Sequence, residues 1–375
     1  MTNHTHYAQL INEKRTTTVT AFPKTSKNLS RRGFIGASTL APAALMLQAG
    51  EAHAAANTRA QLAAVHSGSP AHQLLYKTDE FFIAHRGAGN ISPEHTAYAY
   101  AESVRRGALA VEISVRTTSD GQFVCMHDTN IKRTTGASMD VRGHTLAELR
   151  QHKVDMRQNL GEKTGLYDIP TLEEAIAAVD AVPAGGEYAS VGGKKVVLFL
   201  EAKDGPAQAG LVKFITERGL QRRTVIKMYR DGSGGFKPTS RYLKLANSAG
   251  CATWCYFDGG DPIDKISAMA RHENVDAIGV PYYEKPTGAS QGSMSEENVR
   301  ALTSLGKAVI VWEIHRRSAY EKYKALGVKG FMCPDPYWVI GDPFDASVKI
   351  KTGQRPHGML PADPSVAADM PDLTG

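Results

Sequence analysis

The chain of 375 residues contains only four cysteines, Cys125, Cys251, Cys255 and Cys333. So few cysteines exclude a small scaffold held together by disulfides. Cys251 and Cys255 lie four residues apart on a predicted strand, about 13 Å from each other, so they cannot bridge while that strand holds. They also lack the spacing and partners of a zinc site. Cys125 and Cys333 fall within apolar runs, where we expect small buried hydrophobic side chains.

Long hydrophobic runs are also missing. The uncharged stretch 33–50 is too short and too weakly apolar for a stable membrane span. It follows Arg31-Arg32 and precedes Ala52-His53-Ala54, which is the pattern of a twin-arginine signal with a small-residue cleavage site. We therefore expect residues 1–54 to be a signal peptide recognised by the twin-arginine export machinery, and the mature protein to be periplasmic or secreted.

The basic character of the chain comes partly from this leader. Residues 1–54 hold six Lys or Arg against two Asp or Glu, so the formal net charge falls from +6 to +2 without them. No basic run of the nucleic-acid-binding type remains, so we expect no nucleic acid partner.

The rest of the chain, about 320 residues, suits one barrel domain with insertions. Short apolar runs alternate with helical periodicity, which predicts parallel strands joined by helices. The predicted strands are Phe81–Ala84, Leu109–Val115, Val196–Lys203, Thr224–Met228, Ala252–Tyr256, Ala277–Val280, Lys307–Ile314 and Lys329–Cys333. The predicted helices are Glu94–Arg106, Ile169–Val182, Leu211–Arg218, Pro262–Arg271, Glu296–Leu305 and Ala319–Leu326. We therefore expect a parallel α/β barrel within residues 55–342.

Two segments do not follow this alternation of strands and helices. Residues 129–168 come after the second strand without barrel periodicity, so we expect a small insertion over the mouth of the barrel. Residues 343–375 are rich in Pro, Ala and Asp, and we expect an extended or disordered tail. After the insertion, Thr171 is the predicted N-cap of the next helix, with Glu174 three residues later.

Polar side chains gather where several apolar runs end. His85 and Arg86 come directly after the first predicted strand, and Glu112 lies on the second. Glu201 and Lys203 end a later strand, and the alternation of side chains along a strand places both on one face. Side chains at the carboxyl ends of barrel strands converge on one mouth while their backbones stay rigid.

A hairpin adds a second histidine to this group. The Asp120-Gly121 turn leads into a returning strand over residues 122–127. The fold of this hairpin brings His127 roughly opposite Glu112. Two imidazoles for proton transfer, acids for a divalent cation and an arginine for phosphate oxygens together indicate phosphodiester cleavage.

The ordered set of motifs resembles the glycerophosphodiester phosphodiesterase family. The segments that carry the likeness are His85-Arg86-Gly87, Pro93-Glu94-His95-Thr96, Glu112-Ile113-Ser114-Val115, Thr118-Ser119-Asp120-Gly121, His127-Asp128, Arg133-Thr134-Thr135 and Glu201-Ala202-Lys203. Two further matches are Ile169–Ala175 and Val328–Pro336. The likeness spans roughly residues 80–340, and its specificity lies in the ordered set because each motif alone is weak.

The resemblance implies a TIM-type (β/α)8 barrel with a small insertion after the second strand. It implies that His85 and His127 are the catalytic acid and base, and that Arg86 and Lys203 bind the phosphate of a small-molecule phosphodiester. It also implies a divalent metal ion, Ca²⁺ or Mg²⁺, with oxygen ligands that suit such ions. The positions that match the family's ligands here are Glu112, Glu201 and Ser114.

Three positions depart from the family pattern. Ser114 stands where the family has Asp, so the site loses a negative charge and its affinity for a metal ion should fall. His95 replaces an Asn beside the first histidine motif. Glu313 lies in an altered strand end, and we hypothesise that Glu313 or Asp128 partly replaces the lost acid. If Trp312 faces the mouth, alternation points Glu313 away, which favours a salt-bridge role for Glu313 over a ligand role.

The expected reaction is hydrolysis of a glycerophosphodiester to glycerol 3-phosphate and an alcohol, with two-histidine acid/base catalysis assisted by a metal ion. The attacking group could be water or the neighbouring glycerol hydroxyl, which would give a cyclic phosphate first. Three alternatives stay open: a phospholipase D-like or sphingomyelinase D-like enzyme of whole lipids, a non-catalytic phosphoester-binding protein, and a plain barrel with buried histidines. The aromatic side chains that could form a lipid-binding rim are Tyr282, Tyr283, Trp254, Tyr337 and Trp338.

Overall fold

The computed structural model of the protein describes residues 68–184, 192–283 and 292–334. The predicted signal peptide and the predicted tail lie outside these residues, as do Tyr337 and Trp338. Within the described part of the chain, no helix is long and apolar enough to cross a membrane.

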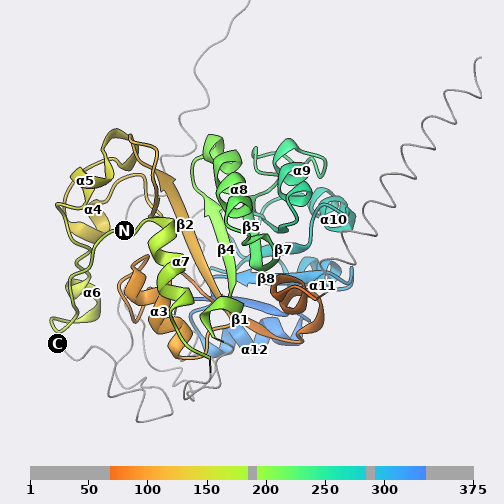
Figure 1. Ribbon diagram of the computed structural model, residues 1–375. Coiled ribbons are helices and arrows are strands. Elements are labelled where there is room, and N and C mark those ends of the chain that lie inside the picture. Colours follow the sequence, from red (N-terminus) through yellow and green to blue (C-terminus); the bar gives the residue numbers. More distant parts are fainter. Residues whose placement is uncertain (1–67, 185–191, 284–291, 335–375) are drawn as a thin grey trace, which may run out of the picture. The chain divides into compact units, whose positions relative to one another are not determined.

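Eight parallel strands form a closed barrel (Figure 1). These strands are β1 (Phe81–Ala84), β2 (Ala110–Thr117), β4 (Val197–Ala202), β5 (Thr224–Tyr229), β6 (Ala252–Tyr256), β7 (Ala277–Pro281), β8 (Ala308–Trp312) and β9 (Gly330–Cys333). They pair in chain order, and β1 closes the barrel because it pairs with both β2 and β9. The ends of each strand lie within two residues of the predicted ends, so the predicted TIM-type barrel is confirmed.

Helices cover the outside of the barrel strands (Figure 1). They are α3 (Ala97–Arg105), α7 (Leu172–Asp180), α8 (Gln208–Glu217), α9 (Arg241–Ser248), α10 (Ile263–Arg271), α11 (Glu296–Thr303) and α12 (Arg317–Ala325). The predicted N-cap of α7 is confirmed: Thr171 accepts from the backbone N–H of Glu174, whose carboxylate accepts from the backbone N–H of Thr171. Such a capping box stabilises a helix by about 1 kcal/mol.

Short elements fill the remaining connections. Before β1 lie α2 (Pro70–His72) and the π-helix η1 (Gln73–Lys77). Three short 3₁₀ turns are η3 (Gly193–Lys195), η4 (Gly205–Ala207) and η5 (Gln221–Arg223). Leu74 and Leu75 of η1 pack in the same cluster as Phe81 and Phe199 from the barrel strands. The segment before β1 therefore covers the barrel core at the amino ends of the strands.

The segment between β2 and α7 starts with a hairpin. Strand β3 (Phe123–Cys125) runs antiparallel to β2, with Cys125 opposite Val115. Four short helices come next: α4 (Lys132–Thr135), η2 (Val141–Gly143), α5 (Leu146–Leu149) and α6 (Arg157–Leu160). This segment has a hydrophobic cluster of its own, which includes Ile131 and Leu149.

Strand β3 ends at Cys125, two residues short of the end predicted for this strand. The hairpin still carries the chain back along β2, because the backbone N–H of Met126 donates to the carbonyl of Ser114. All four cysteines are buried and none of them forms a disulfide, and the burial of Cys125 and Cys333 agrees with the expected small hydrophobic side chains.

Side chains that point into the barrel change from apolar to charged along β2, β4 and β5. Near the amino ends they are apolar: Ala110, Val197, Phe199, Val225 and Trp254 share one cluster. Two residues further along β2, β4 and β5, the same alternating positions hold Glu112, Glu201 and Lys227, all of them buried. The polar residues therefore form a layer at the carboxyl ends of the strands, which is where barrel enzymes carry their sites.

Candidate active site

Two glutamates and a lysine make direct contact inside the barrel. Lys227 Nζ lies 3.1 Å from Glu112 Oε1 and 2.9 Å from Glu201 Oε2. The strand order β2-β4-β5 explains the contact, because these three neighbouring strands place the side chains side by side. Lys227 was not among the residues selected from the sequence.

Both carboxylates also have further partners. Glu112 Oε1 accepts from Ser114 Oγ at 2.9 Å, and Glu112 Oε2 accepts from the backbone N–H of Arg86 at 3.1 Å. Glu201 Oε1 accepts from the Tyr256 hydroxyl at 2.7 Å and lies 3.2 Å from Lys203 Nζ. Each carboxylate is therefore held by donors on several sides.

These contacts fix the charges of the cluster. Burial opposes ionisation of Glu112, but Lys227 and the nearby histidines outweigh it and hold the pKa well below its usual range. Burial likewise opposes ionisation of Glu201, and Lys203 and Lys227 lower its pKa to about 2. Burial would lower the pKa of Lys227, but Glu112 and Glu201 raise it above the ordinary lysine value. Both glutamates are negative and Lys227 is positive at neutral pH.

Arg86 lies directly after β1 with its backbone in the left-handed region (φ 55°). This conformation lets its N–H reach Glu112 while the guanidinium turns toward Glu94, with Nη1 3.3 Å from Oε2. Arg86 Nε is buried and has no hydrogen-bond partner among the described residues. A buried N–H without a partner costs free energy, so this donor is suited to an anionic ligand.

The first predicted histidine, His85, contacts Glu313 from the end of β8. The distance from His85 Nδ1 to Glu313 Oε2 is 3.1 Å, and His315 Nε2 lies 3.3 Å from the same oxygen. Burial opposes ionisation of Glu313, but His85 and His315 hold its pKa well below the usual range. Because Glu313 holds Nδ1, the ring orientation is set and Nε2 is left to exchange a proton.

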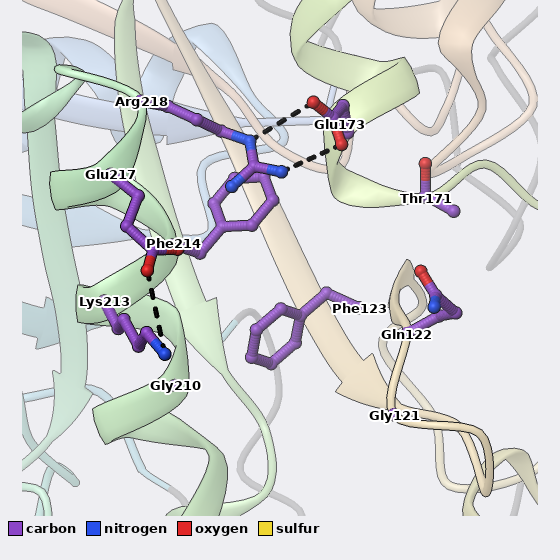
Figure 2. A pocket seen from close by; sticks show the side chains of 10 residues that line it. All are labelled: Gly121, Gln122, Phe123, Thr171, Glu173, Gly210, Lys213, Phe214, Glu217 and Arg218. Atoms are coloured by element: carbon purple, nitrogen blue, oxygen red, sulfur yellow. Dashed lines mark hydrogen bonds and ion pairs between the residues drawn. The ribbon is translucent and has the colours of Figure 1, made fainter.

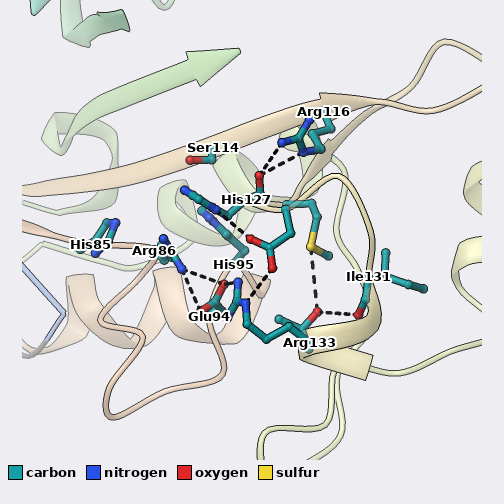
Figure 3. Close-up of polar contacts among 12 residues, drawn as sticks. His85, Arg86, Glu94, His95, Ser114, Arg116, His127, Ile131 and Arg133 are labelled. Atoms are coloured by element: carbon teal, nitrogen blue, oxygen red, sulfur yellow. Dashed lines mark hydrogen bonds and ion pairs between the residues drawn. The ribbon is translucent and has the colours of Figure 1, made fainter. Parts of the chain in front are cut away.

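The second predicted histidine, His127, is held at two points (Figure 3). Its Nδ1 lies 2.9 Å from Asp128 Oδ1, and its backbone carbonyl accepts from Nε and Nη2 of Arg116 at 3.0 and 2.8 Å. Burial lowers the pKa of His127 well below the ordinary value, and the nearby charges of Lys203 and Arg86 add to the effect. His127 is therefore neutral at neutral pH, as a general base must be.

A chain of ion pairs connects His127 to Arg86 (Figure 3). Asp128 Oδ2 accepts from Arg133 Nε at 2.7 Å. Arg133 then donates through Nη1 and Nη2 to the two oxygens of Glu94 at 2.8 and 2.7 Å, and Glu94 pairs with Arg86. The segment after β3 thus ties the loop after β1 to His127.

His95, the second departure from the family pattern, is buried beside this chain. Its Nδ1 is 2.5 Å from the Tyr100 hydroxyl, and its Nε2 has no hydrogen-bond partner among the described residues. Burial lowers the pKa of His95 to about 3, so the ring is neutral. His95 therefore adds no charge at neutral pH.

The structure brings all seven residues selected from the sequence into this cluster at the end of the barrel. They are His85, His127, Arg86, Lys203, Glu112, Glu201 and Ser114. The two acids proposed to replace the missing aspartate have other partners, since Glu313 pairs with His85 and Asp128 pairs with His127 and Arg133. Sequence reasoning missed Lys227, although a lysine inside the apolar run Thr224–Met228 was a signal for it.

A separate hollow lies on the outer surface (Figure 2). It has a volume of about 260 Å³ and is lined by the hairpin turn and by α7 and α8, with Phe123, Phe214 and Arg218 among its residues. None of the selected residues lines it, so it is not part of this cluster.

Histidines, carboxylates and cations gather at the carboxyl end of a parallel barrel, which is where enzymes with this fold carry their active sites. Comparison with known proteins indicates a phosphodiesterase. The sequence profile of the Glycerophosphoryl diester phosphodiesterase family matches residues 85–226. A glycerophosphodiester phosphodiesterase of Caldanaerobacter subterraneus subsp. tengcongensis is 26% identical over 264 residues, which cover 69% of this chain and 95% of that protein.

A shorter and closer match covers part of the barrel. A probable glycerophosphodiester phosphodiesterase 1 of Mycobacterium tuberculosis is 50% identical over 72 residues, which are 19% of this chain and 26% of that protein. Among solved structures, an Oleispira antarctica phosphodiesterase in complex with the product sn-glycerol-3-phosphate superimposes with a TM-score of 0.53. The two share 19% identity, and the match covers 69% of this chain and 94% of the other. At that identity the likeness supports the fold alone.

The chain is similar to the glycerophosphodiester phosphodiesterase family over residues 85–226, and relatives with that name match it over most of their own length. It is therefore a phosphoric diester hydrolase.

Proposed function

We propose that the protein hydrolyses a glycerophosphodiester to glycerol 3-phosphate and an alcohol. One observation carries this proposal: two imidazoles, each with Nδ1 held by a carboxylate, belong to one cluster with Arg86 and Lys203. The names of the relatives agree with it, and the Oleispira antarctica phosphodiesterase was solved with sn-glycerol-3-phosphate as its product.

The two histidines take different roles. His127 is neutral, so it accepts the proton of the attacking hydroxyl. His85, with Nδ1 held by Glu313, donates a proton to the oxygen of the leaving alcohol. An O–P bond forms to the attacking oxygen, and the bond from phosphorus to the alcohol oxygen breaks. The attacker is water or the glycerol hydroxyl beside the phosphate, and release of a cyclic phosphate identifies the second route.

The cations of the cluster stabilise the charge that develops on the phosphoryl oxygens. Arg86 presents the buried Nε that has no partner among the described residues, and this N–H can donate to a phosphate oxygen. Lys203 pairs with Glu201 at 3.2 Å, and an ammonium has three donors, so it has donors left for the phosphate.

The divalent cation implied by the family does not fit the side chains in their present arrangement. A Ca²⁺ ion needs six to eight oxygen ligands at about 2.3–2.6 Å. Between Glu112 and Glu201, the expected place for such an ion, lies Lys227 Nζ. Ser114 directs its hydroxyl at Glu112, and the described residues contain no group of three His, Cys, Asp or Glu side chains able to hold a metal ion. The expected set of Glu112, Glu201 and Ser114 remains a prediction, and no step of the proposed reaction depends on a metal ion.

The lipid-hydrolase alternative loses part of its support. Trp254, one of the side chains expected in an aromatic rim, is fully buried inside the barrel. Three large apolar side chains are exposed on the described residues: Leu109 and Leu166 lie in connecting segments, and Leu245 lies on α9. No contact in the cluster, as far as the described residues go, favours a whole lipid over a small phosphodiester.

Product analysis tests this proposal. The purified protein is incubated with glycerophosphocholine, lysophosphatidylcholine and sphingomyelin, and we expect glycerol 3-phosphate from the first. His85→Ala and His127→Ala should each lower turnover by about 10²–10⁴-fold. The control is His152→Ala, since His152 is not a member of the cluster. Near-normal turnover in either active-site variant would remove that histidine from the mechanism.

Export is the remaining part of the proposal. The twin arginines at positions 31 and 32, the apolar stretch and the Ala52-His53-Ala54 site support a periplasmic or secreted enzyme. Replacement of both arginines by lysine should leave the precursor inside the cell. Export of that variant at the normal rate would contradict the twin-arginine route.

A further inference from the structure

Lys227 occupies a place built for a cation. Its ammonium lies about 3 Å from an oxygen of each glutamate, at 3.1 Å from Glu112 and 2.9 Å from Glu201. It also lies 5.2 Å and 5.5 Å from the ring centroids of Tyr256 and Trp254, within the range of cation–π attraction. Two carboxylates and two aromatic faces therefore surround one positive charge.

The surroundings hold this charge away from solvent. Lys227 is buried, and the carboxylate of Glu112 is fully enclosed. A buried ion pair is tolerated only where geometry is good and further hydrogen bonds satisfy the charged groups. Ser114, the backbone N–H of Arg86 and the Tyr256 hydroxyl supply those bonds.

The net charge of this buried group accounts for two sequence features, the serine at position 114 and the lysine at position 227. An aspartate at position 114 with Glu112 and Glu201 would make three carboxylates, and a divalent cation among them would leave one net negative charge. Here Ser114 removes one carboxylate, and Lys227 supplies a single positive charge. Two carboxylates around one ammonium leave the same net charge of minus one, so the serine and the lysine compensate each other.

We propose that the ammonium of Lys227 replaces the divalent cation, so that this enzyme cleaves phosphodiesters without a metal ion. The inference rests on the proposed function. Lys227 is a positioning residue: it holds Glu112 and Glu201 apart and in place, and through Glu112 it fixes the backbone N–H of Arg86. It keeps its proton throughout, while the histidines carry out the proton transfers.

The first test compares the wild-type protein with and without a chelator. After treatment with EDTA, we expect glycerophosphocholine turnover to change by less than about twofold, with no gain from added Ca²⁺ or Mg²⁺. In isothermal titration calorimetry, millimolar Ca²⁺ should give no binding signal, and the melting temperature should not shift. A tenfold loss in EDTA restored by Ca²⁺, or stoichiometric Ca²⁺ binding with a higher melting temperature, would overturn the proposal.

The second test reverses the two changes. Ser114→Asp combined with Lys227→Ser restores a third carboxylate and removes the ammonium, so this double variant should bind Ca²⁺. Ca²⁺ at about 100 times its Kd should stabilise the folded variant by about 2.7 kcal/mol, seen as a rise in melting temperature. The matched control is Lys213→Ser, an exposed lysine on α8, which should acquire no response to Ca²⁺. Absence of any Ca²⁺ response in a folded double variant would contradict the replacement.

The outcomes separate this inference from the proposed function. No turnover of any phosphodiester, with or without ions, would refute the proposed hydrolysis. The Ca²⁺ titrations and melting curves of the wild-type protein would still decide whether Lys227 excludes the ion. If the double variant fails to fold, the wild-type titration alone carries the decision.

Discussion

Replacement of Lys227 by methionine should lower the free energy of unfolding, and the size of this decrease should depend on pH. Methionine has a similar length but no charge, so Glu112 and Glu201 would be buried next to each other without a cation. Removal of one partner from a buried ion pair costs about 3–5 kcal/mol. The wild-type side chains are at most 8% exposed, so solvent screens these charges little.

The pH dependence arises from the two carboxylates. In the wild-type protein both carboxylates have lowered pKa values, and the pKa of Glu201 is about 2. Their contribution to stability is therefore fully present above the unfolded-state pKa near 4.5. It is lost only as the pH falls toward the pKa values of the folded state. In Lys227→Met, repulsion and burial should raise at least one pKa above the unfolded value. The folded variant then takes up a proton as the pH falls, and its deficit should shrink by about 1.4 kcal/mol per pH unit for each proton bound.

Urea unfolding of both proteins at pH 7.5, 6.5 and 5.5 measures this effect. We expect a deficit of about 3–5 kcal/mol at pH 7.5 that becomes smaller at each lower pH. Lys213→Met is the control, because an exposed i,i+4 pair contributes only about 0.3–0.5 kcal/mol. A deficit below about 1 kcal/mol, or one that stays constant with pH, would refute the buried ion triad.

Three further predictions concern the histidines. Glu313→Gln keeps the size of the side chain that orients His85 but removes its charge, so kcat should fall on the order of 10²-fold with little change in KM, and an unchanged kcat would contradict this role. Arg133→Met breaks the chain of ion pairs beside His127, and misplacement of that ring should lower kcat by up to about 10²-fold while the far-UV circular dichroism stays the same. Because burial lowers the pKa of His127, kcat/KM should stay level from pH 8 down to about 6 and fall only at lower pH. A fall of kcat/KM centred at or above the ordinary histidine pKa near 6.5 would contradict a neutral buried base.

The barrel was predictable because its strands are distinct in the sequence. Strands buried on both faces are continuous apolar runs, and β6 (Ala252–Tyr256) has the predicted ends. Helix α9 was missed because it comes directly after the Gly- and Ser-rich stretch 231–240. Its signal was the N-cap Ser240, whose side chain accepts from the backbone N–H of Leu243.

The members of the site were predictable, but their pairings were not. His85, Glu112 and Glu201 are identified by motifs at strand ends, which are local in the sequence. The contact between Lys227 and Glu112 joins residues 115 positions apart, and only the order of strands in the closed barrel shows it. In the same way, the partner of His85 proved to be Glu313, which lies just beyond Trp312, where β8 ends and the simple alternation of side chains stops.

A structure of the protein with bound glycerol 3-phosphate tests the central claim most directly. The account predicts phosphate oxygens within about 2.7–3.2 Å of Arg86 Nε and Lys203 Nζ, with Nε2 of His85 and of His127 facing opposite sides of the phosphorus and Lys227 still between the two glutamates. A phosphate bound away from the histidines, for example in the hollow beside Phe123, or a metal ion in the place of the Lys227 ammonium, would contradict it.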